Sequence, residues 1–146
     1  AVRMAVAMEA GDLAEADRTR ARAAVAALRR FVTGQPEQEA RVAELERLLE
    51  RRFQLEDAAL SHPDVLQAAV IAVSHDKWQE RPLLLVVRRQ GATVDGQAIL
   101  DHMRPRLASW WMPDAVEFMD EFPMTGTGKV QKMALRTRFK DYRVGA

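Results

Sequence analysis

The 146-residue chain contains no cysteine. It therefore has no disulfide, no thiolate nucleophile and no cysteine-ligated zinc or iron–sulfur site, and this composition is compatible with the reducing cytoplasm. Its longest apolar runs, AAVIAV and PLLLVV, are far too short to span a bilayer, and its first residues lack a signal-peptide pattern. His62, His75 and His102 are scattered without the spacing of metal ligands. We therefore expect a cytoplasmic protein with no membrane span and no metal site.

The chain also lacks an excess of charge of either sign. With 22 basic and 21 acidic residues, its formal net charge is only +1. This balance gives no global reason to expect nucleic acid or an anionic membrane as a partner. The basic stretch near the C-terminus has no interleaved aromatic residues, so we interpret it as a solvated helix face. Hydrophobic residues make up 48% of the chain, which is typical of a folded domain.

Residues 1–53 are rich in Ala, Arg and Glu and are predicted to form a helical hairpin of unknown role. Asp12 followed by Glu15 fits a capping box at a helix start. Gly34 and Pro36 fit a helix stop followed by a restart, because glycine tolerates the left-handed conformation and proline suits a first helical turn. The second helix is predicted to carry one apolar stripe, made of Val42, Leu45, Leu49 and Phe53.

Residues 54–146 show a different pattern, in which apolar, β-branched segments alternate with helical ones. A capping Asp95 predicts a helix that presents Ile99, Leu100, Met103 and Leu107, with Pro105 bending or ending its regular part. The predicted elements are a short helix at 55–60, strands at 65–73, 83–87 and 116–119, and a basic helix at 130–142. Together these predict an α/β (α+β) fold, with a small mixed sheet of about three strands flanked by helices and preceded by the hairpin.

The segment FPMTGTGKVQK, residues 122–132, is the candidate site. A Walker A loop is excluded because Pro123 stands where its first glycine is required and Val130 where a Ser or Thr must follow the lysine. What remains is Lys129 on a glycine-flanked loop, a mobile cation suited to anionic oxygens. The glycines allow close backbone approach and the threonines offer hydroxyls. For GTGK in isolation, a solvated turn with a surface lysine is the better interpretation.

The longer segment resembles the last signature motif of the adenylate-forming superfamily, which includes acyl-CoA synthetases, peptide-synthetase adenylation domains and luciferases. The matching positions are Pro123, Thr125, Gly128, Lys129 and Lys132. Upstream, HPDVLQAAVIAVSHDKWQERPLLLVV and LASWWMPDAVEFMDEFP resemble the preceding family segments, in the same order and spacing. WWMP and KWQERP are most similar to medium- and long-chain fatty acyl-CoA synthetases. The resemblance covers roughly 55–142 and concerns the small C-terminal lid domain of those enzymes only.

This resemblance implies a carboxylate that attacks the α-phosphate of ATP and an acyl group that then passes to CoA. The family's invariant lysine corresponds to Lys129, the predicted catalytic residue. Predicted cofactor-binding residues are Thr125, Gly126, Thr127, Gly128 and Lys132, the last in a supporting role. The implied cofactors are ATP with magnesium and CoA, none expected to bind tightly to this chain alone. The implied partners are an AMP-binding N-terminal domain, in cis or in trans, and a fatty acid.

Two departures from the family pattern limit this expectation. The chain contains no AMP-binding domain, and RVAELERLLERRFQ replaces the glycine-rich hinge hairpin that the family has before Leu55. The chain alone is therefore not expected to be a competent ligase. A lid that works in trans, a fragment or fusion, and a domain reused for binding all stay open. A second hypothesis is an interaction module in which residues 1–53 self-associate, although their apolar stripe could equally dock on the α/β part.

Overall fold

The computed structural model describes residues 2–75, 77 and 79–143, with side chains described from Glu15 onward apart from Gln79. Contacts divide the chain into two compact units, Ala1–Phe53 and Gln54–Ala146. Trp78, which is part of the KWQERP resemblance, lies outside the described residues. No helix in the described part of the chain is long and apolar enough to cross a membrane.

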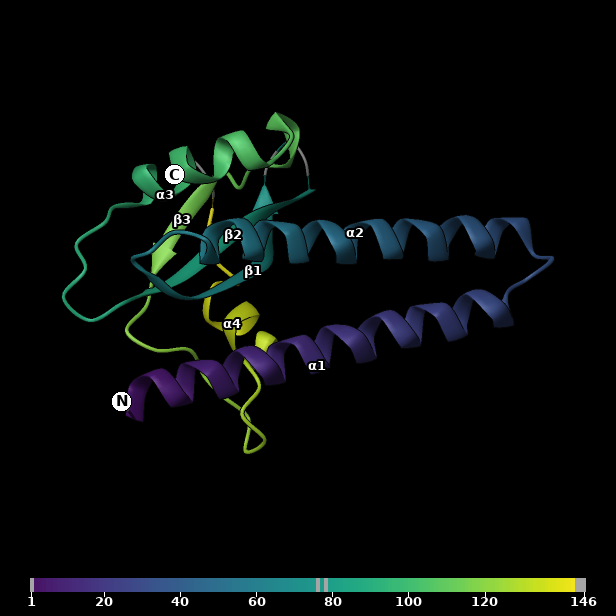
Figure 1. The fold of residues 1–146 in the computed structure, drawn as a ribbon. Helices are drawn as coiled ribbons and strands as arrows, with labels where there is room; N and C mark the ends of the chain where they lie inside the picture. Colours follow the sequence, from purple (N-terminus) through teal and green to yellow (C-terminus); the bar gives the residue numbers. More distant parts are fainter. Residues whose placement is uncertain (1, 76, 78, 144–146) are drawn as a thin grey trace. The chain divides into compact units, whose positions relative to one another are not determined.

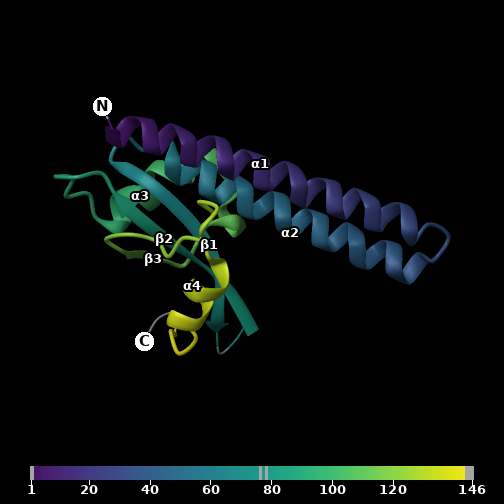
Figure 2. The same cartoon turned by 90° about the horizontal axis from the view of Figure 1, so that it is seen from below.

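The first unit is built from two antiparallel helices that lie side by side, α1 (Val2–Phe31) and the first part of α2 (Pro36–Leu60) (Figures 1 and 2). Gly34 has a φ of +87° and Pro36 is the first residue of α2, so the predicted stop and restart are confirmed. The predicted helix start at Asp12 is wrong, because α1 already begins at Val2. The alanine-rich sequence before Asp12 has high helix propensity, which outweighs a local capping signal.

A narrow apolar seam joins the two helices. Its buried members are Val25, Val32 and Val42, with Leu49 packed against them. The members on each helix are seven residues apart, which places them on one side of that helix. Leu45 is 47% exposed, so this member of the predicted apolar stripe lies outside the seam. Two helices alone enclose only the residues directly between them, and their flanks stay in water.

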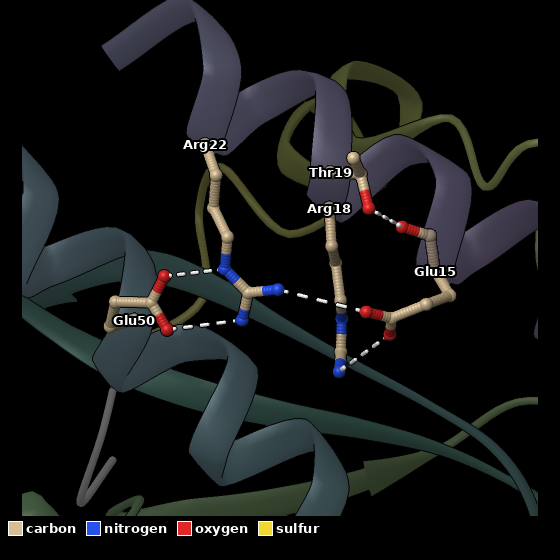
Figure 3. A network of polar contacts seen from close by, with 5 residues as sticks. All are labelled: Glu15, Arg18, Thr19, Arg22 and Glu50. Atoms are coloured by element: carbon tan, nitrogen blue, oxygen red, sulfur yellow. Dashed lines mark hydrogen bonds and ion pairs between the residues drawn. The ribbon is translucent and has the colours of Figure 1, made fainter. Parts of the chain in front are cut away.

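Arginine–carboxylate pairs follow one flank of this seam (Figure 3). Arg22 donates two hydrogen bonds to Glu50, at 2.7 and 3.1 Å, and also lies 3.6 Å from Glu15. The hydrogen bond from Arg22 lowers the pKa of the Glu50 carboxyl below its ordinary value, although burial acts in the opposite direction. The guanidinium groups of Arg18 and Arg22 lie 4.7 and 5.0 Å from the centre of the Phe53 ring. Such exposed pairs contribute about 0–1 kcal/mol each, so they add little to the stability of the unit.

Helix α2 continues past the boundary of the first unit and supplies its last turns to the second. The helix predicted separately at 55–60 is the C-terminal end of α2, which corrects that prediction. No glycine or proline interrupts the sequence between Phe53 and Leu60, so the helical backbone has no local reason to stop there. It ends just before Pro63, which disfavours helical geometry at His62.

The second unit contains a mixed three-stranded sheet, ordered β1 (Val65–His75), β2 (Gln79–Arg88) and β3 (Ala115–Phe118). Strand β1 pairs antiparallel with β2, and β2 pairs parallel with β3. The predicted fold class is therefore confirmed. Strands β1 and β2 extend beyond the predicted apolar runs because backbone pairing continues into their polar ends, where side chains need no burial.

Alternate residues of β2 enter two cores on opposite faces of the sheet. On one face, Leu84 and Val86 pack with α3 (Gly96–Met103) and with the end of α2. On the other face, Leu83, Leu85 and Val87 pack with α4 (Lys132–Arg138). Figure 1 shows α3 and α4 on opposite sides of the strands. The sheet is thus the middle layer of a small sandwich.

Two predicted helices of this unit, one capped by Asp95 and one at 130–142, correspond to α3 and α4. Asp95 caps α3 as predicted, since its side chain accepts a hydrogen bond of 2.8 Å from the Ala98 N–H. Of the predicted apolar face, Ile99 and Met103 are fully buried. Leu100 and Leu107 pack partly buried against the same core, and Leu107 lies beyond the end of α3. Helix α4 covers only part of the predicted 130–142, because the chain before Lys132 is held in an extended bridge described below.

We predict that Leu84→Ala destabilises the second unit by about 2–5 kcal/mol, because it removes a fully buried side chain from the central strand. Leu60→Ala, at a position 41% exposed, is the matched control and should cost less than about 1 kcal/mol. Urea unfolding followed by tryptophan fluorescence measures this unit alone, because all three tryptophans, residues 78, 110 and 111, belong to it. Equal losses for both variants would contradict this assignment of the core.

Candidate functional site

The predicted site residues lie in one structured loop, residues 123–132, which we call the Lys129 loop. Phe122, just before it, is buried in the same core as Leu135 of α4. An antiparallel bridge joins Met124 to Val130, and the Gln131 N–H donates to the Pro123 carbonyl at 2.8 Å. Both ends of the loop are therefore held together, and its tip projects from this narrow stem.

Hydrogen bonds inside the loop centre on Thr125. Its N–H donates to the Lys129 carbonyl at 2.7 Å, and its carbonyl accepts from the Gly128 N–H at 3.0 Å. Its hydroxyl oxygen accepts from the Lys129 N–H at 3.1 Å and lies 3.0 Å from the Thr127 hydroxyl oxygen. Thr125 thus fixes the turn, while Thr127 is the exposed hydroxyl of the pair.

The two loop glycines serve different purposes. Gly128 has a φ of +85°, a left-handed conformation that costs other L-residues roughly 1–2 kcal/mol. At Gly126 no positive φ is needed, and an added Cβ would meet no heavy atom of the described residues within 4 Å. Gly128 is therefore required by the turn itself, whereas Gly126 leaves open space beside the loop tip.

Lys129 and Lys132 are both half-buried, but their backbones and side chains have different surroundings. The backbone of Lys129 is fixed on both sides by Thr125, so the residue leaves the turn in a defined direction. The Lys132 ammonium lies 2.5 Å from Oε1 of Glu56 and 3.3 Å from the Val70 carbonyl. The structure therefore brings Thr125 to Lys129 together in one turn and gives Lys132 partners within the chain. The predicted contact of Lys132 with a cofactor stays a prediction.

Glu56 is the residue near this site that the sequence reasoning missed. It lies in the last turns of α2, is only 8% exposed, and accepts a hydrogen bond of 3.0 Å from the Val70 N–H. A signal was available in the sequence. Glu56 stands among the apolar residues Leu55, Ala58 and Ala59, and a carboxylate at a core-facing position of a helix requires a partner.

The histidines do not form a second reactive centre. The Ser61 hydroxyl donates to the Ala58 carbonyl at 2.6 Å, so its oxygen accepts from His102 at 2.8 Å and its proton is already engaged. Burial, followed by the nearby charges of Arg106 and His62, lowers the pKa of His102. Among the described residues, no group of three or more His, Asp or Glu side chains is placed to hold a metal ion.

Known proteins share this sheet, loop and helix arrangement. The profile of the AMP-binding enzyme C-terminal domain matches residues 54–129. The chain belongs to this family. The match ends on Lys129, and residues 1–53 lie outside it.

Relatives of the family agree with this assignment. The chain is 44% identical over 92 residues to a 3-methylmercaptopropionyl-CoA ligase of Ruegeria pomeroyi, covering 63% of this chain and 17% of that protein. It is 45% identical over 93 residues to a long-chain-fatty-acid–CoA ligase of Thermus thermophilus, covering 63% of this chain and 17% of that protein. The crystal structure of ATP-bound MatB from Rhodopseudomonas palustris matches with a TM-score of 0.60 and 37% identity. The match covers 62% of this chain and 18% of that one. The chain therefore spans about a sixth of the length of these relatives.

We predict that Gly128→Ala lowers the free energy of opening the Lys129 loop by roughly 1–2 kcal/mol, because alanine disfavours the left-handed conformation. Gly126→Ala is the matched control, since its Cβ would meet no described atom and no positive φ is required. Amide hydrogen exchange at Lys129, whose N–H donates to Thr125, measures the effect and should rise about tenfold in the Gly128 variant alone. Similar exchange in both variants would contradict the role of Gly128.

Proposed function

We propose that residues 54–146 are the lid domain of an ATP-dependent acyl-CoA synthetase and that Lys129 acts in its adenylation step. The observation that supports this most is the ordered Lys129 loop inside a domain of the AMP-binding enzyme C-terminal family, with Lys129 at the end of the matched range. An AMP-binding N-terminal domain, in cis or in trans, is the partner that this proposal requires, and a fatty acid is the proposed substrate.

Lys129 would act by electrostatics. Adenylation joins a carboxylate to the α-phosphate of ATP, so negative charge accumulates on the oxygens between them. A fixed ammonium stabilises that charge more in the transition state than in the ground state. The hydrogen bonds between Thr125 and the backbone of Lys129 hold the base of the lysine in one direction, so less reorganisation is needed when the reaction occurs.

The loop residues fit the phosphate groups of ATP. Thr127 offers an exposed hydroxyl, and the open space beside Gly126 allows a phosphate to approach the backbone. ATP, when bound, supplies the phosphorus atom that the carboxylate attacks. Magnesium would accompany the nucleotide, because it prefers phosphate oxygens as ligands. CoA belongs to the second half-reaction. Residues of α2 stand in the sequence where the family has its hinge hairpin, so we propose adenylation as the step that this chain serves.

We predict that Lys129→Ala lowers acyl-adenylate formation by roughly 10²–10³-fold, the usual cost of removing a group that stabilises a charged transition state. The assay mixes the purified chain with ATP, magnesium, a panel of fatty acids and a separately supplied N-terminal domain of a family enzyme. Lys140→Ala, an exposed lysine just beyond α4, is the control and should retain activity. Unchanged activity in Lys129→Ala would refute the proposal.

A second candidate function, self-association through residues 1–53, is favoured by a separate observation. Among the described side chains of the helical unit, four large apolar ones are exposed, and Phe31 is 82% exposed. At 100° per residue they share the flank of the seam opposite the Arg22–Glu50 and Arg29–Glu46 pairs. These side chains are Leu28, Phe31, Leu45 and Leu48. A second copy of the hairpin could cover this flank and complete a four-helix bundle.

Light scattering on the purified chain tests this candidate. We expect a dimer that Leu45→Glu together with Leu48→Glu converts to a monomer, because two carboxylates would have to be buried in the interface. Ala40→Glu, at an exposed position on another face of α2, should leave the dimer intact. A monomeric wild-type chain would exclude self-association and leave the lid function as the sole candidate.

A further inference from the structure

We propose that Glu56 and Lys132 are positioning residues for the Lys129 loop and that they act together at the outer edge of β1. This inference deepens the proposed adenylation role of Lys129 and rests on it. We call the group formed by Glu56, the Val70 peptide and Lys132 the edge contact. It joins three elements that are distant in sequence: the end of α2, the middle of β1 and the first residue of α4.

The backbone of Val70 explains why both charges are present. Strand β1 lies at one end of the strand order, and Val70 directs both its N–H and its C=O to side chains. An outer strand presents backbone groups that need partners when they are covered. Here the Glu56 carboxylate accepts from the N–H at 3.0 Å, and the Lys132 ammonium lies 3.3 Å from the C=O. The two side chains also meet each other, at 2.5 Å.

The edge contact connects the two layers that cover the sheet. Glu56 is carried by the helix end that packs on one face, beside Leu55 and Ala59. Lys132 begins the helix whose Leu135 packs on the opposite face. The ion pair therefore passes around the side of β1 and holds the start of α4 against it. Glu56 has a side chain only 10% exposed, so water competes weakly for this contact.

Lys132 follows Lys129 by only three residues, and this short distance gives the edge contact its proposed effect. The stem of the loop is closed by the Met124–Val130 bridge and the Gln131–Pro123 hydrogen bond. The next residue, Lys132, fixes that stem to the sheet. Without the edge contact the stem would be held less firmly, so the turn would open more often and the loop would move relative to the core. The Lys129 ammonium would then occupy its productive position for less of the time.

Hydrogen exchange on the 15N-labelled full chain tests the contact without nucleotide. We expect Glu56→Gln and Lys132→Met to speed exchange of the Gly128 and Lys129 amides about tenfold or more, the effect of losing a hydrogen bond to a charged group. The Met119 amide, which donates to Val86 in the core, should change by less than about threefold. Equal acceleration at loop and core amides would indicate general destabilisation and would overturn the inference, as would unchanged loop exchange.

Three further variants sharpen the test. Lys132→Arg should restore slow loop exchange, because a guanidinium can donate to both Glu56 and the Val70 carbonyl. The charge-swapped double variant, Glu56→Lys with Lys132→Glu, should not restore slow loop exchange, because an ammonium would then face the Val70 N–H. Full rescue by this double variant would overturn the part assigned to Val70. Arg138→Met, an exposed position on α4, is the matched control and should leave loop exchange unchanged.

The adenylation mixture supplies the functional readout. Lys132→Met should lower kcat at least about tenfold while KM for ATP stays within about threefold, because the Lys129 cation is kept but misplaced. Lys132→Arg should recover most of kcat. A rise in KM at unchanged kcat would show direct nucleotide contact and overturn the positioning role. Failure of the proposed function would be seen as an active Lys129→Ala variant. Failure of the edge contact would be seen in the hydrogen exchange, which is measured without ATP, so the two failures are distinguishable.

Discussion

Burial of β2 on both faces is the constraint on which the second unit depends. Leu83, Leu84 and Leu85 are fully buried, and successive side chains of a strand point to opposite faces. One layer of helices cannot cover both faces. The chain must therefore bring α3 and the end of α2 to one face and α4 to the other. The Lys129 loop exists because the chain has to cross from β3 to α4 on the second face.

This constraint also creates the problem that Glu56 and Lys132 solve. A three-stranded sheet has two outer strands, and β1 has helices from both layers close to its backbone. Apolar packing cannot satisfy backbone N–H and C=O groups. A carboxylate and an ammonium can satisfy one each and also neutralise each other. A charged pair in this position is more than a source of stability, because its geometry determines where α4 begins and where the loop is attached.

The helical unit follows a simpler physical rule. Two helices share one seam, and the residues in it, Val25, Val32 and Val42, are buried. Leu28 and Leu45 lie beside the seam and stay exposed. Helix α2 contributes to both units because nothing in its sequence stops it between Phe53 and Leu60. The apolar stripe was predicted from spacing alone, and spacing cannot tell how many neighbours a helix has. Helix α1 covers Val42 and Leu49 of the stripe, and Leu45 stays exposed.

The sequence by itself determined the local features: the turn at Gly34 and Pro36, the Asp95 cap, the three apolar strands, the fold class and the family to which the Lys129 motif points. These depend on residues close together in the chain, where backbone preference and periodicity are strong. Only the tertiary structure decided that Glu56 lies beside Lys132, which exposed leucines share a flank, and how the Lys129 loop is fixed. Glu56 and Lys132 are separated by most of the second unit in sequence, and only the layering around β2 brings a carboxylate and an ammonium to the same peptide group.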